Sequence, residues 1–330
     1  MDPVRVLEFI RDPQGVWNLP ASFMESLARE FPAVRFDSPR DLAEAEEALP
    51  EAAVVFGWAV RASNFARARS LRWIHVSAAG VGSALFPALV ESEVVLTNGR
   101  GLHAVAMAEH ALGVMLALAR RLHLARDAQR DRRWSQVPLW IEPPGPGQLE
   151  GGTLGLLGLG AVGRALAQRA AALGMRVIAV RRHPAREPAP AHEQWGVERL
   201  DDLLACADWM VLAAPLTAET RGLIGRERLA RLRPTAALVN LGRGALVDEG
   251  ALCEALAAGR LAGAALDVFE HEPLPDDSPL WSMPNVIVTP HISGLGPRYW
   301  ERGVELFRRN LTAFLDGRPL ENVVDKRAGY

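Results

Sequence analysis

The chain has little cysteine, with only Cys206 and Cys253 among its 330 residues. Both lie in stretches that have the composition of helices, and neither belongs to a Cys or His spacing typical of a metal site. Disulfides persist mainly in oxidising compartments. We therefore predict two reduced thiols, no bound metal and a cytoplasmic location.

Long apolar runs and an excess of charge of one sign are also absent. The most apolar helical stretch, Ala111 to Ala119, is too short to span a bilayer. The N-terminal sequence M-D-P-V-R-V-L lacks the apolar core of a signal peptide. Lys and Arg number 37 against 39 Asp and Glu, which leaves a net charge of −2. This balance indicates no surface for nucleic acid or membranes, so we expect a small-molecule partner.

Apolar residues make up 49% of the chain, which is enough to fill the cores of about two domains. Short apolar runs alternate with helical patterns, and this alternation predicts an α/β fold with parallel sheets covered on both faces. The expected strands are 4–10, 34–37, 52–58, 73–78, 94–98, 153–157, 176–180, 209–215, 236–242, 263–268 and 286–290. The principal expected helices are 20–30, 41–49, 103–121, 164–173 and 297–315.

The most informative motif is T-L-G-L-L-G-L-G-A-V-G at residues 153–163. An apolar run precedes Gly158, Gly160 and Gly163 in G-x-G-x-x-G spacing, and helix-forming residues follow. Gly158 permits a tight turn, Gly160 lets the backbone approach a pyrophosphate, and Gly163 allows close packing of the helix. An ordinary glycine turn is the alternative, but a second strand at the spacing of a βαβ unit favours a dinucleotide site.

Two arginines follow that second strand, at the place where an NAD-binding fold usually has an acidic residue for the ribose hydroxyls. Arg181 occupies this place and Arg182 comes next. Guanidinium groups form charge-assisted, bidentate bonds with phosphate, so the pair favours NADPH over NAD. The alternative is a solvated pair of surface charges.

Polar residues follow two of the later strands. Arg243 lies between two glycines, and His291 ends the run V-I-V-T-P-H. Such residues usually have structural or solvated roles, but ligands of a parallel sheet bind at the carboxyl ends of its strands. The Arg243 fork matches a carboxylate, and Glu272 is a candidate partner that would favour a protonated His291. Together they are typical of hydride transfer beside a nicotinamide.

These motifs resemble the D-isomer-specific 2-hydroxyacid dehydrogenases. The matching segments between residues 149 and 294 are G-L-G-A-V-G, P-L-T-A-E-T, N-L-G-R-G-A-L-V-D, A-A-L-D-V-F-E-H-E-P-L-P and T-P-H-I-S-G. The first half is similar through A-A-G-V-G-S and A-E-H-A-L. The ending V-D-K-R-A-G-Y and the V-R-R after the second strand look most like the glyoxylate/hydroxypyruvate reductases.

The resemblance implies two doubly wound parallel-sheet domains. A Rossmann cofactor domain, residues 101–294, would be inserted into a flavodoxin-like substrate domain made of residues 1–100 and 295–330. The implied activity is reduction of a small 2-keto acid to the D-2-hydroxy acid, with catalytic Arg243, Glu272 and His291. The rivals are a dinucleotide-sensing protein without turnover, and an enzyme of the same fold with another donor, such as formate or phosphite.

The expected binding residues belong to two groups. Those for the cofactor are Gly158, Gly160, Ala161, Val162, Gly163, Arg181, Arg182, Pro215, Thr220, Leu241, Gly242, Asp267 and Gly294, where only the resemblance implies Thr220 and a contact of Asp267 with the nicotinamide carboxamide. Those for the substrate are Trp58, Ala79, Gly80, Val81 and Gly82, with Arg243 and His291. The turn at 79–82 is either an ordinary loop or a nest of N–H groups for the substrate carboxylate. Trp58 either forms a wall of the pocket or is a packed surface aromatic.

The helix expected at 103–121 is apolar almost all round, which predicts burial and a homodimer interface. The resemblance also implies a two-fold dimer through the cofactor domains. Trp140, in the run P-L-W, either reaches the substrate pocket of the neighbour or packs within its own subunit.

Overall fold

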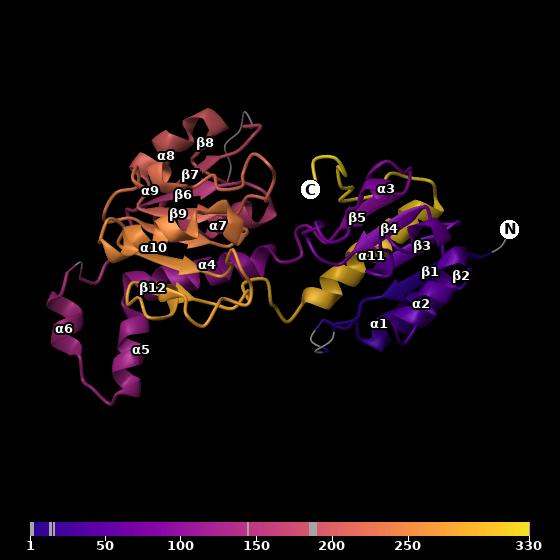
Figure 1. Cartoon of the computed structure of the whole chain (residues 1–330), viewed down its shortest axis with the longest axis horizontal. Helices are drawn as coiled ribbons and strands as arrows, with labels where there is room; N and C mark the ends of the chain where they lie inside the picture. Colours follow the sequence, from indigo (N-terminus) through magenta and orange to yellow (C-terminus); the bar gives the residue numbers. More distant parts are fainter. Residues whose placement is uncertain (1–2, 13–14, 16, 144, 185–189, 330) are drawn as a thin grey trace. The chain divides into compact units, whose positions relative to one another are not determined.

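A computed structural model describes residues 3–12, 15, 17–143, 145–184 and 190–329. The chain forms two compact units, one made of residues 1–102 and 297–330 and the other of residues 103–296. Each is an α/β unit built on its own sheet (Figure 1). The two parallel-sheet domains confirm the predicted fold class.

In the first unit, the described residues form a five-stranded, all-parallel sheet with the order β2-β1-β3-β4-β5. This is the strand order of flavodoxin-like folds. The strands are β1 (Val4–Phe9), β2 (Val34–Asp37), β3 (Val54–Gly57), β4 (Trp73–Val76) and β5 (Val95–Asn98). The helices are α1 (Ala21–Glu30), α2 (Leu42–Ala48), α3 (Pro87–Val90) and α11 (Tyr299–Leu315), with the 3-10 turns η1 (Leu49–Glu51) and η2 (Phe65–Arg67).

Alternate side chains of these strands enter two cores, because successive residues of a strand face opposite sides of the sheet. Val6 packs with α1 and α11 on one face, and Leu7 packs with α2 and α3 on the other. Phe307 of α11 stacks on Phe56 of β3, with ring centroids 4.1 Å apart. The helix near the end of the chain therefore completes the core of the first unit.

The second unit has a seven-stranded, all-parallel sheet among its described residues, with the order β12-β11-β10-β9-β6-β7-β8. The strands are β6 (Thr153–Leu157), β7 (Arg176–Val180), β8 (Glu193–Trp195), β9 (Trp209–Leu212), β10 (Ala237–Asn240), β11 (Gly263–Leu266) and β12 (Val286–Val288). The winding reverses between β6 and β9. A parallel sheet of this kind binds its ligand outside the carboxyl ends of the strands at that point.

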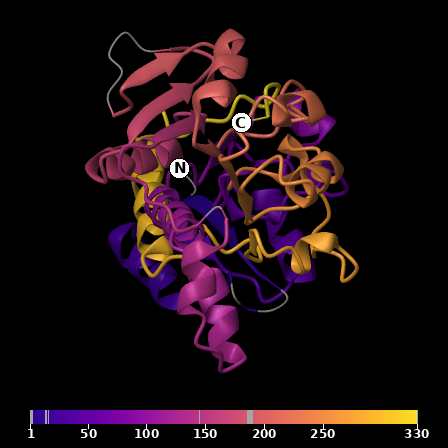
Figure 2. The ribbon, with the colours of Figure 1, turned by 90° about the vertical axis from the view of Figure 1, so that its left-hand side faces the viewer.

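Helices cover both faces of this sheet. Those on one face are α4 (Ala104–Ala119) and α7 (Ala161–Ala172), and those on the other are α8 (Leu200–Cys206), α9 (Arg226–Leu229) and α10 (Glu249–Ala257). Two further helices, α5 (Leu122–Arg130) and α6 (Gln136–Ile141), project from the rest of the unit (Figures 1 and 2). The 3-10 turns are η3 (Val197–Arg199), η4 (Gly244–Leu246) and η5 (Pro279–Trp281).

Some elements differ from the sequence-based expectation. The sequence did not predict α5, α6 or β8. The strand expected at 286–290 is shorter and only half-buried, because β12 lies at the edge of the sheet and pairs with β11 alone. The helix expected to reach Arg121 ends at Ala119, since Arg121 has a left-handed backbone with a φ of 56°.

The structure also describes the two cysteine thiols and the length of the apolar helices. Both cysteines are free, and burial raises the pKa of the Cys206 and Cys253 thiols, which favours the unreactive protonated form. Of the helices in the described ranges, none combines the length and apolar character needed to cross a membrane.

Candidate active site

The turn between β6 and α7 needs glycine at two positions. Gly158 has a φ of +99°, and a Cβ there would lie 2.9 Å from the carbonyl oxygen of Ala213. A Cβ on Gly163 would lie 2.3 Å from the carbonyl oxygen of Gly158. Both approaches are too close for any side chain, so these glycines allow the tight turn and the close packing of α7.

Gly160 has a different environment from the other two. It is exposed and is the N-cap of α7, and a Cβ built on it would meet no atom within 4 Å in the described structure. No side chain from the described residues caps this end of the helix. The next two residues, exposed Ala161 and half-buried Val162, begin the helix. An open, uncapped helix N-terminus after a glycine turn fits the pyrophosphate of a dinucleotide.

His291 and Glu272 are in direct contact at the carboxyl edge of the sheet. The Nδ1 atom of His291 lies 2.7 Å from Oε2 of Glu272, and both side chains are partly exposed. The other carboxylate oxygen, Oε1, accepts a hydrogen bond of 3.0 Å from the backbone N–H of Phe269. Glu272 is thereby fixed and orients the imidazole with Nδ1–H toward itself, which leaves Nε2 for other chemistry.

Arg243 follows β10 on an exposed loop, and its Nη1 atom donates to the carbonyl oxygen of Gly242 at 2.6 Å. Buried Asn240 shapes this loop: its Nδ2 donates to the carbonyl oxygen of Arg243 at 3.0 Å, and its Oδ1 accepts from the N–H of Gly242 at 3.1 Å. This role of Asn240 is not predicted from the sequence. The signal in the sequence that could have indicated it is a polar residue at the end of the apolar strand β10.

Asp267 is buried, with 1% of its surface exposed. Its Oδ1 accepts hydrogen bonds from Thr289 Oγ1 at 2.6 Å and from the N–H of Ile292 at 2.9 Å. Its Oδ2 accepts from the N–H of Ser293 at 3.0 Å. The carboxylate that the resemblance placed at the nicotinamide therefore also holds the loop that carries His291.

Other residues expected at the cofactor have intramolecular roles as well. Thr220 closes its own turn, since its Oγ1 donates to the carbonyl oxygen of Pro215 at 2.8 Å and accepts from the N–H of Thr217 at 2.7 Å. Leu241 is buried and Gly242 lies in the same buried segment, so only their backbones can reach a ligand.

The two arginines after β7 differ in their surroundings. Arg181 is half-buried, and its backbone N–H donates to the carbonyl oxygen of Trp195 at 3.0 Å. Arg182 is exposed and its Nη2 atom lies 3.8 Å from Oε2 of Glu219. Glu219, which the sequence did not suggest, therefore offsets part of the charge of Arg182.

The predicted substrate loop belongs to the first unit. Asn98 Nδ2 donates to the carbonyl oxygen of Ala79 at 2.8 Å, and the hydroxyl of Tyr299 donates to that of Ser77 at 3.0 Å. Val81 is buried, whereas Ala79 and Gly82 are exposed. Asn98 thus anchors this loop and Tyr299 the residue just before it, and neither anchor is predicted from the sequence.

Trp58 follows Gly57, whose φ of +122° and contact with the backbone of Phe9 require glycine. The Trp58 side chain is half-buried against the core on the α2 and α3 side of the sheet. Its packing is therefore established, and a further role in a pocket stays a prediction.

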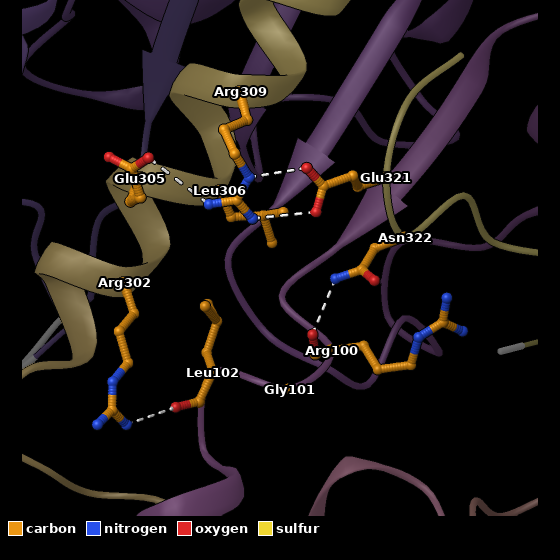
Figure 3. Close-up of a pocket in the computed structure, with 9 residues that line it drawn as sticks. All are labelled: Arg100, Gly101, Leu102, Arg302, Glu305, Leu306, Arg309, Glu321 and Asn322. Atoms are coloured by element: carbon orange, nitrogen blue, oxygen red, sulfur yellow. Dashed lines mark hydrogen bonds and ion pairs between the residues drawn. The ribbon is translucent and has the colours of Figure 1, made fainter.

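A hollow of about 350 Å³ in the first unit is separate from these residues. Three arginines, Arg100, Arg302 and Arg309, are among the residues that line it, but they do not converge (Figure 3). Arg309 is paired with Glu321 through two bonds of 2.7 and 3.0 Å, and the side chain of Arg100 runs away from the other two. No residue predicted for the site lines this hollow.

The seven-stranded sheet with its glycine turn defines a dinucleotide-binding dehydrogenase unit. A sequence model of the D-isomer specific 2-hydroxyacid dehydrogenase NAD binding domain matches residues 112–293. The chain belongs to the D-isomer specific 2-hydroxyacid dehydrogenase family, which confirms the resemblance seen in its motifs. It is thus an NAD(P)-dependent oxidoreductase of the 2-hydroxyacid dehydrogenase type.

Individual relatives cover almost the whole chain. Glyoxylate/hydroxypyruvate reductase B of Pectobacterium carotovorum subsp. carotovorum (strain PC1) is 36% identical over 304 residues, which are 91% of this chain and 93% of that protein. A D-isomer specific 2-hydroxyacid dehydrogenase from Xanthobacter autotrophicus Py2, solved with NADPH and MES, is 31% identical with a TM-score of 0.80, covering 100% of both chains. An NADPH-dependent glyoxylate/hydroxypyruvate reductase from Sinorhizobium meliloti, solved with NADP and sulfate, is 28% identical with a TM-score of 0.81, covering 99% of this chain and 100% of that one.

Proposed function

We propose that this protein reduces a small 2-keto acid, of the glyoxylate or hydroxypyruvate kind, to the D-2-hydroxy acid with NADPH. The observation that carries the proposal is the 2.7 Å contact between His291 and Glu272, on the sheet edge that also carries Arg243. Relatives named glyoxylate/hydroxypyruvate reductase support the substrate class. A cytoplasmic location, predicted from the two free thiols, is part of the proposal.

The nicotinamide cofactor, when bound, supplies the hydride. Gly160, Ala161 and Val162 present the backbone of an open helix N-terminus to its pyrophosphate. Gly158 and Gly163 hold that turn in shape, and the loops at Pro215–Thr220, Leu241–Gly242 and Gly294 form the neighbouring part of the proposed site. Asp267 still has a lone pair on Oδ2 that can accept from a carboxamide N–H, in addition to its three bonds within the loop.

Arg243 is proposed to bind the carboxylate of the keto acid and to polarise its carbonyl. Its side chain is exposed, and its bond to the carbonyl oxygen of Gly242 engages Nη1 and leaves the rest of the guanidinium fork for the substrate. A fixed cation beside the carbonyl oxygen stabilises the negative charge that develops there during hydride transfer.

His291 is proposed to protonate that oxygen through Nε2, because Nδ1 is bonded to Glu272. The carboxylate accepts from Nδ1–H and holds the ring in one orientation, so that Nε2 remains for the transfer. In the first unit, backbone N–H groups at 79–82 are proposed to bind the substrate carboxylate and Trp58 to contact the substrate.

The preference for NADPH rests on Arg181 and Arg182. Neither residue is the acid that would repel a 2′-phosphate, and both guanidinium groups follow the strand whose end lies near the adenosine ribose in Rossmann folds. Relatives solved with NADPH or NADP support this assignment. The contact of Arg182 with Glu219 weakens the contribution of that arginine, so Arg181 is proposed to be the stronger determinant.

A keto-acid panel, run with NADPH and with NADH, tests the proposal. We expect turnover of glyoxylate and hydroxypyruvate that is faster with NADPH. Binding of NADPH without turnover of any keto acid would favour the sensing protein. Oxidation of formate or phosphite in preference to a hydroxy acid would identify the other donor class.

We also propose a homodimer built around α4 and its neighbours. Helix α4 packs on α7 and β11 within its own unit, but part of its apolar surface stays accessible, with Leu116 38% exposed. The most exposed large apolar side chains lie on or beside the neighbouring α6, where Trp134, Val137, Trp140 and Ile141 are between 63% and 90% exposed. An apolar patch of this kind on a projecting element is typical of an interface, and a second copy is the proposed occupant.

A further inference from the structure

The loop from Thr289 to Gly294 contains a residue with an unusual backbone conformation. His291 has a φ of +53°, in the left-handed region that side chains other than glycine rarely adopt. Its backbone N–H lies 2.9 Å from the carbonyl oxygen of Asp267 and 3.0 Å from that of Thr289. A residue in this region persists only where its surroundings over-determine it, so the contacts that hold the two ends of the loop matter for the position of His291.

Two histidines at α4 contact the two ends of this loop. His103, the N-cap of α4, has its Nδ1 atom 2.9 Å from the carbonyl oxygen of Gly294. His110 has its Nε2 atom 3.2 Å from the Oγ1 of Thr289. The two histidines are seven residues apart, about two turns of helix, so they lie on the same side of α4.

The direction of each hydrogen bond follows from its partners. A carbonyl oxygen only accepts, so Nδ1–H of His103 donates to Gly294. Thr289 donates its own hydroxyl proton to Asp267 at 2.6 Å, so its oxygen accepts from Nε2–H of His110. The first contact therefore needs a donor at the Nδ1 position, and the second needs a donor at the Nε2 position.

Glycine at position 294 is part of the same arrangement. A Cβ there would lie 2.9 Å from Nδ1 and 3.3 Å from Cγ of His103. The loop backbone therefore packs directly on the imidazole ring. A side chain at 294 would push the two apart.

Charge also links His103 to the proposed catalytic groups. Burial lowers the pKa of His103 and the charge of Arg243 lowers it further, against the opposing effect of the hydrogen bond to Gly294. Burial likewise lowers the pKa of His110, against the opposing effect of Asp267. Both histidines are therefore predominantly neutral at pH 7, and His103 adds no positive charge beside Arg243.

We propose that His103 and His110 are positioning residues that clamp the two ends of the Thr289–Gly294 loop and so hold His291 in the orientation needed for proton transfer. The inference rests on the proposed function, in which His291 is the proton donor. Neither histidine is assigned a direct contact with the substrate.

A crossed pair of amide substitutions tests this clamp. Asparagine places its N–H₂ group near the Nδ1 position of histidine, and glutamine places its own near Nε2. We expect His103→Asn and His110→Gln to keep kcat within about twofold of the unchanged protein. We expect His103→Gln and His110→Asn to lower kcat on the order of tenfold to a hundredfold, which is the usual effect of a small displacement of a reacting group.

His123 provides a matched control. Its Nε2 atom lies 3.0 Å from the carbonyl oxygen of Pro284, so it also joins a helix to a distant segment, but that segment precedes β12 and lies outside the loop. His123→Asn and His123→Gln should leave kcat unchanged. If they lower kcat as much as the substitutions at 103 and 110, or if the crossed pattern is absent, the clamp is wrong.

A second readout does not depend on turnover. The ¹H–¹³C ring signal of His291 in the cofactor-free protein, assigned by its loss in His291→Gln, should move in His103→Gln and His110→Asn and stay in place in the matched variants. An unmoved signal in all four variants would also overturn the clamp. If His291→Gln keeps full turnover, the proposed function fails instead, whatever the ring signal shows.

Discussion

At the scale of single residues, the proposed chemistry depends most on Arg243. Its side chain is exposed, so Arg243→Ala removes a charge without opening a cavity. We expect a loss in kcat/KM equivalent to about 3–4 kcal/mol, as for removal of one preorganised electrostatic group. Steady-state kinetics with glyoxylate measure it, and Arg260→Ala, at another exposed arginine, serves as the control. A change in kcat/KM no larger than that of the control would exclude Arg243 from the site.

The cofactor preference is a second question at this scale. A charge-assisted bond to phosphate corresponds to roughly tenfold to a hundredfold in affinity, and salt should reduce it at this accessible position. The double change Arg181→Asp with Arg182→Ala should therefore reverse the preference toward NADH. The check is kcat/KM for both cofactors at two ionic strengths, and equal use of both by the unchanged protein at low salt would mean that the arginines are surface charges only.

A substitution at Glu219 tests the contribution of Arg182 to the cofactor preference separately. The hydroxyl of Thr217, with a smaller contribution from Arg182, lowers the pKa of the Glu219 carboxyl, so this side chain is ionised at neutral pH. Glu219→Gln should remove this opposing charge from beside Arg182 and raise the preference for NADPH by about twofold to fivefold, the range expected of an exposed ion pair. A fall in that preference would contradict the role given to Arg182.

At the scale of secondary-structure elements, strand β4 carries a buried histidine, His75. His75 is fully buried, and burial lowers its pKa to about 3. Its Nδ1 atom lies 2.7 Å from the Oγ1 of Thr97, while its Nε2 has no hydrogen-bond partner among the described residues. The ring therefore takes up a proton more readily in the unfolded chain than in the folded first unit.

This difference predicts a loss of stability in acid. The unfolded chain takes up a proton near pH 6.5 and the folded unit only near pH 3, so the stability is complete above about 6.5 and falls as the pH drops below it. The decrease is about 1.4 kcal/mol per pH unit in that window. Amide hydrogen exchange of β4 at pH 7 and pH 5 measures it, with β10 of the second unit as the internal control. His75→Asn should be less stable at pH 7 but should lose less on acidification, and an equal slope would contradict the assignment.

The elements also show what the sequence could predict. Continuous apolar runs such as Leu154–Leu157 predicted the buried strands, and glycine spacing predicted the turn after β6. The expected strands at 209–215 and 236–242 were too long, because their last residues leave the sheet to form the edge loops. Among their described residues, α5 buries Ala128 alone and α6 buries none, so neither has a broad buried face.

The supporting contacts of the site could not be predicted from the sequence, because they join residues far apart in the chain. The bond of His103 to Gly294 spans 191 positions, and the bonds of Asp267 to the loop reach over some 25. A sequence shows that a histidine follows V-I-V-T-P, but the backbone that turns this histidine toward Glu272 depends on residues in two other elements.

At the scale of the whole molecule, association is the property that the exposed face on and beside α6 predicts. We expect a dimer by sedimentation at micromolar concentration, and we expect Trp140→Arg or Ile141→Asp to dissociate it, because a charge in an apolar interface would lose its hydration. Trp281→Arg, at another exposed tryptophan, is the control and should stay dimeric. A monomeric unchanged protein, or dimeric Trp140→Arg and Ile141→Asp variants, would contradict this interface.

The hydrogen bond between His103 and Gly294 has a consequence for the modular history of such a chain. The second unit begins at 103 and finishes at 296, and this bond, 2.9 Å between His103 Nδ1 and the carbonyl oxygen of Gly294, joins its first residue to a residue two positions before its last. Where the ends of a module meet, a host can accept it in a single surface turn and keep its own core intact. The first unit could therefore receive a complete dinucleotide-binding module between β5 and α11. Either unit could then be replaced by a homologous one without a break in the sheet of the other.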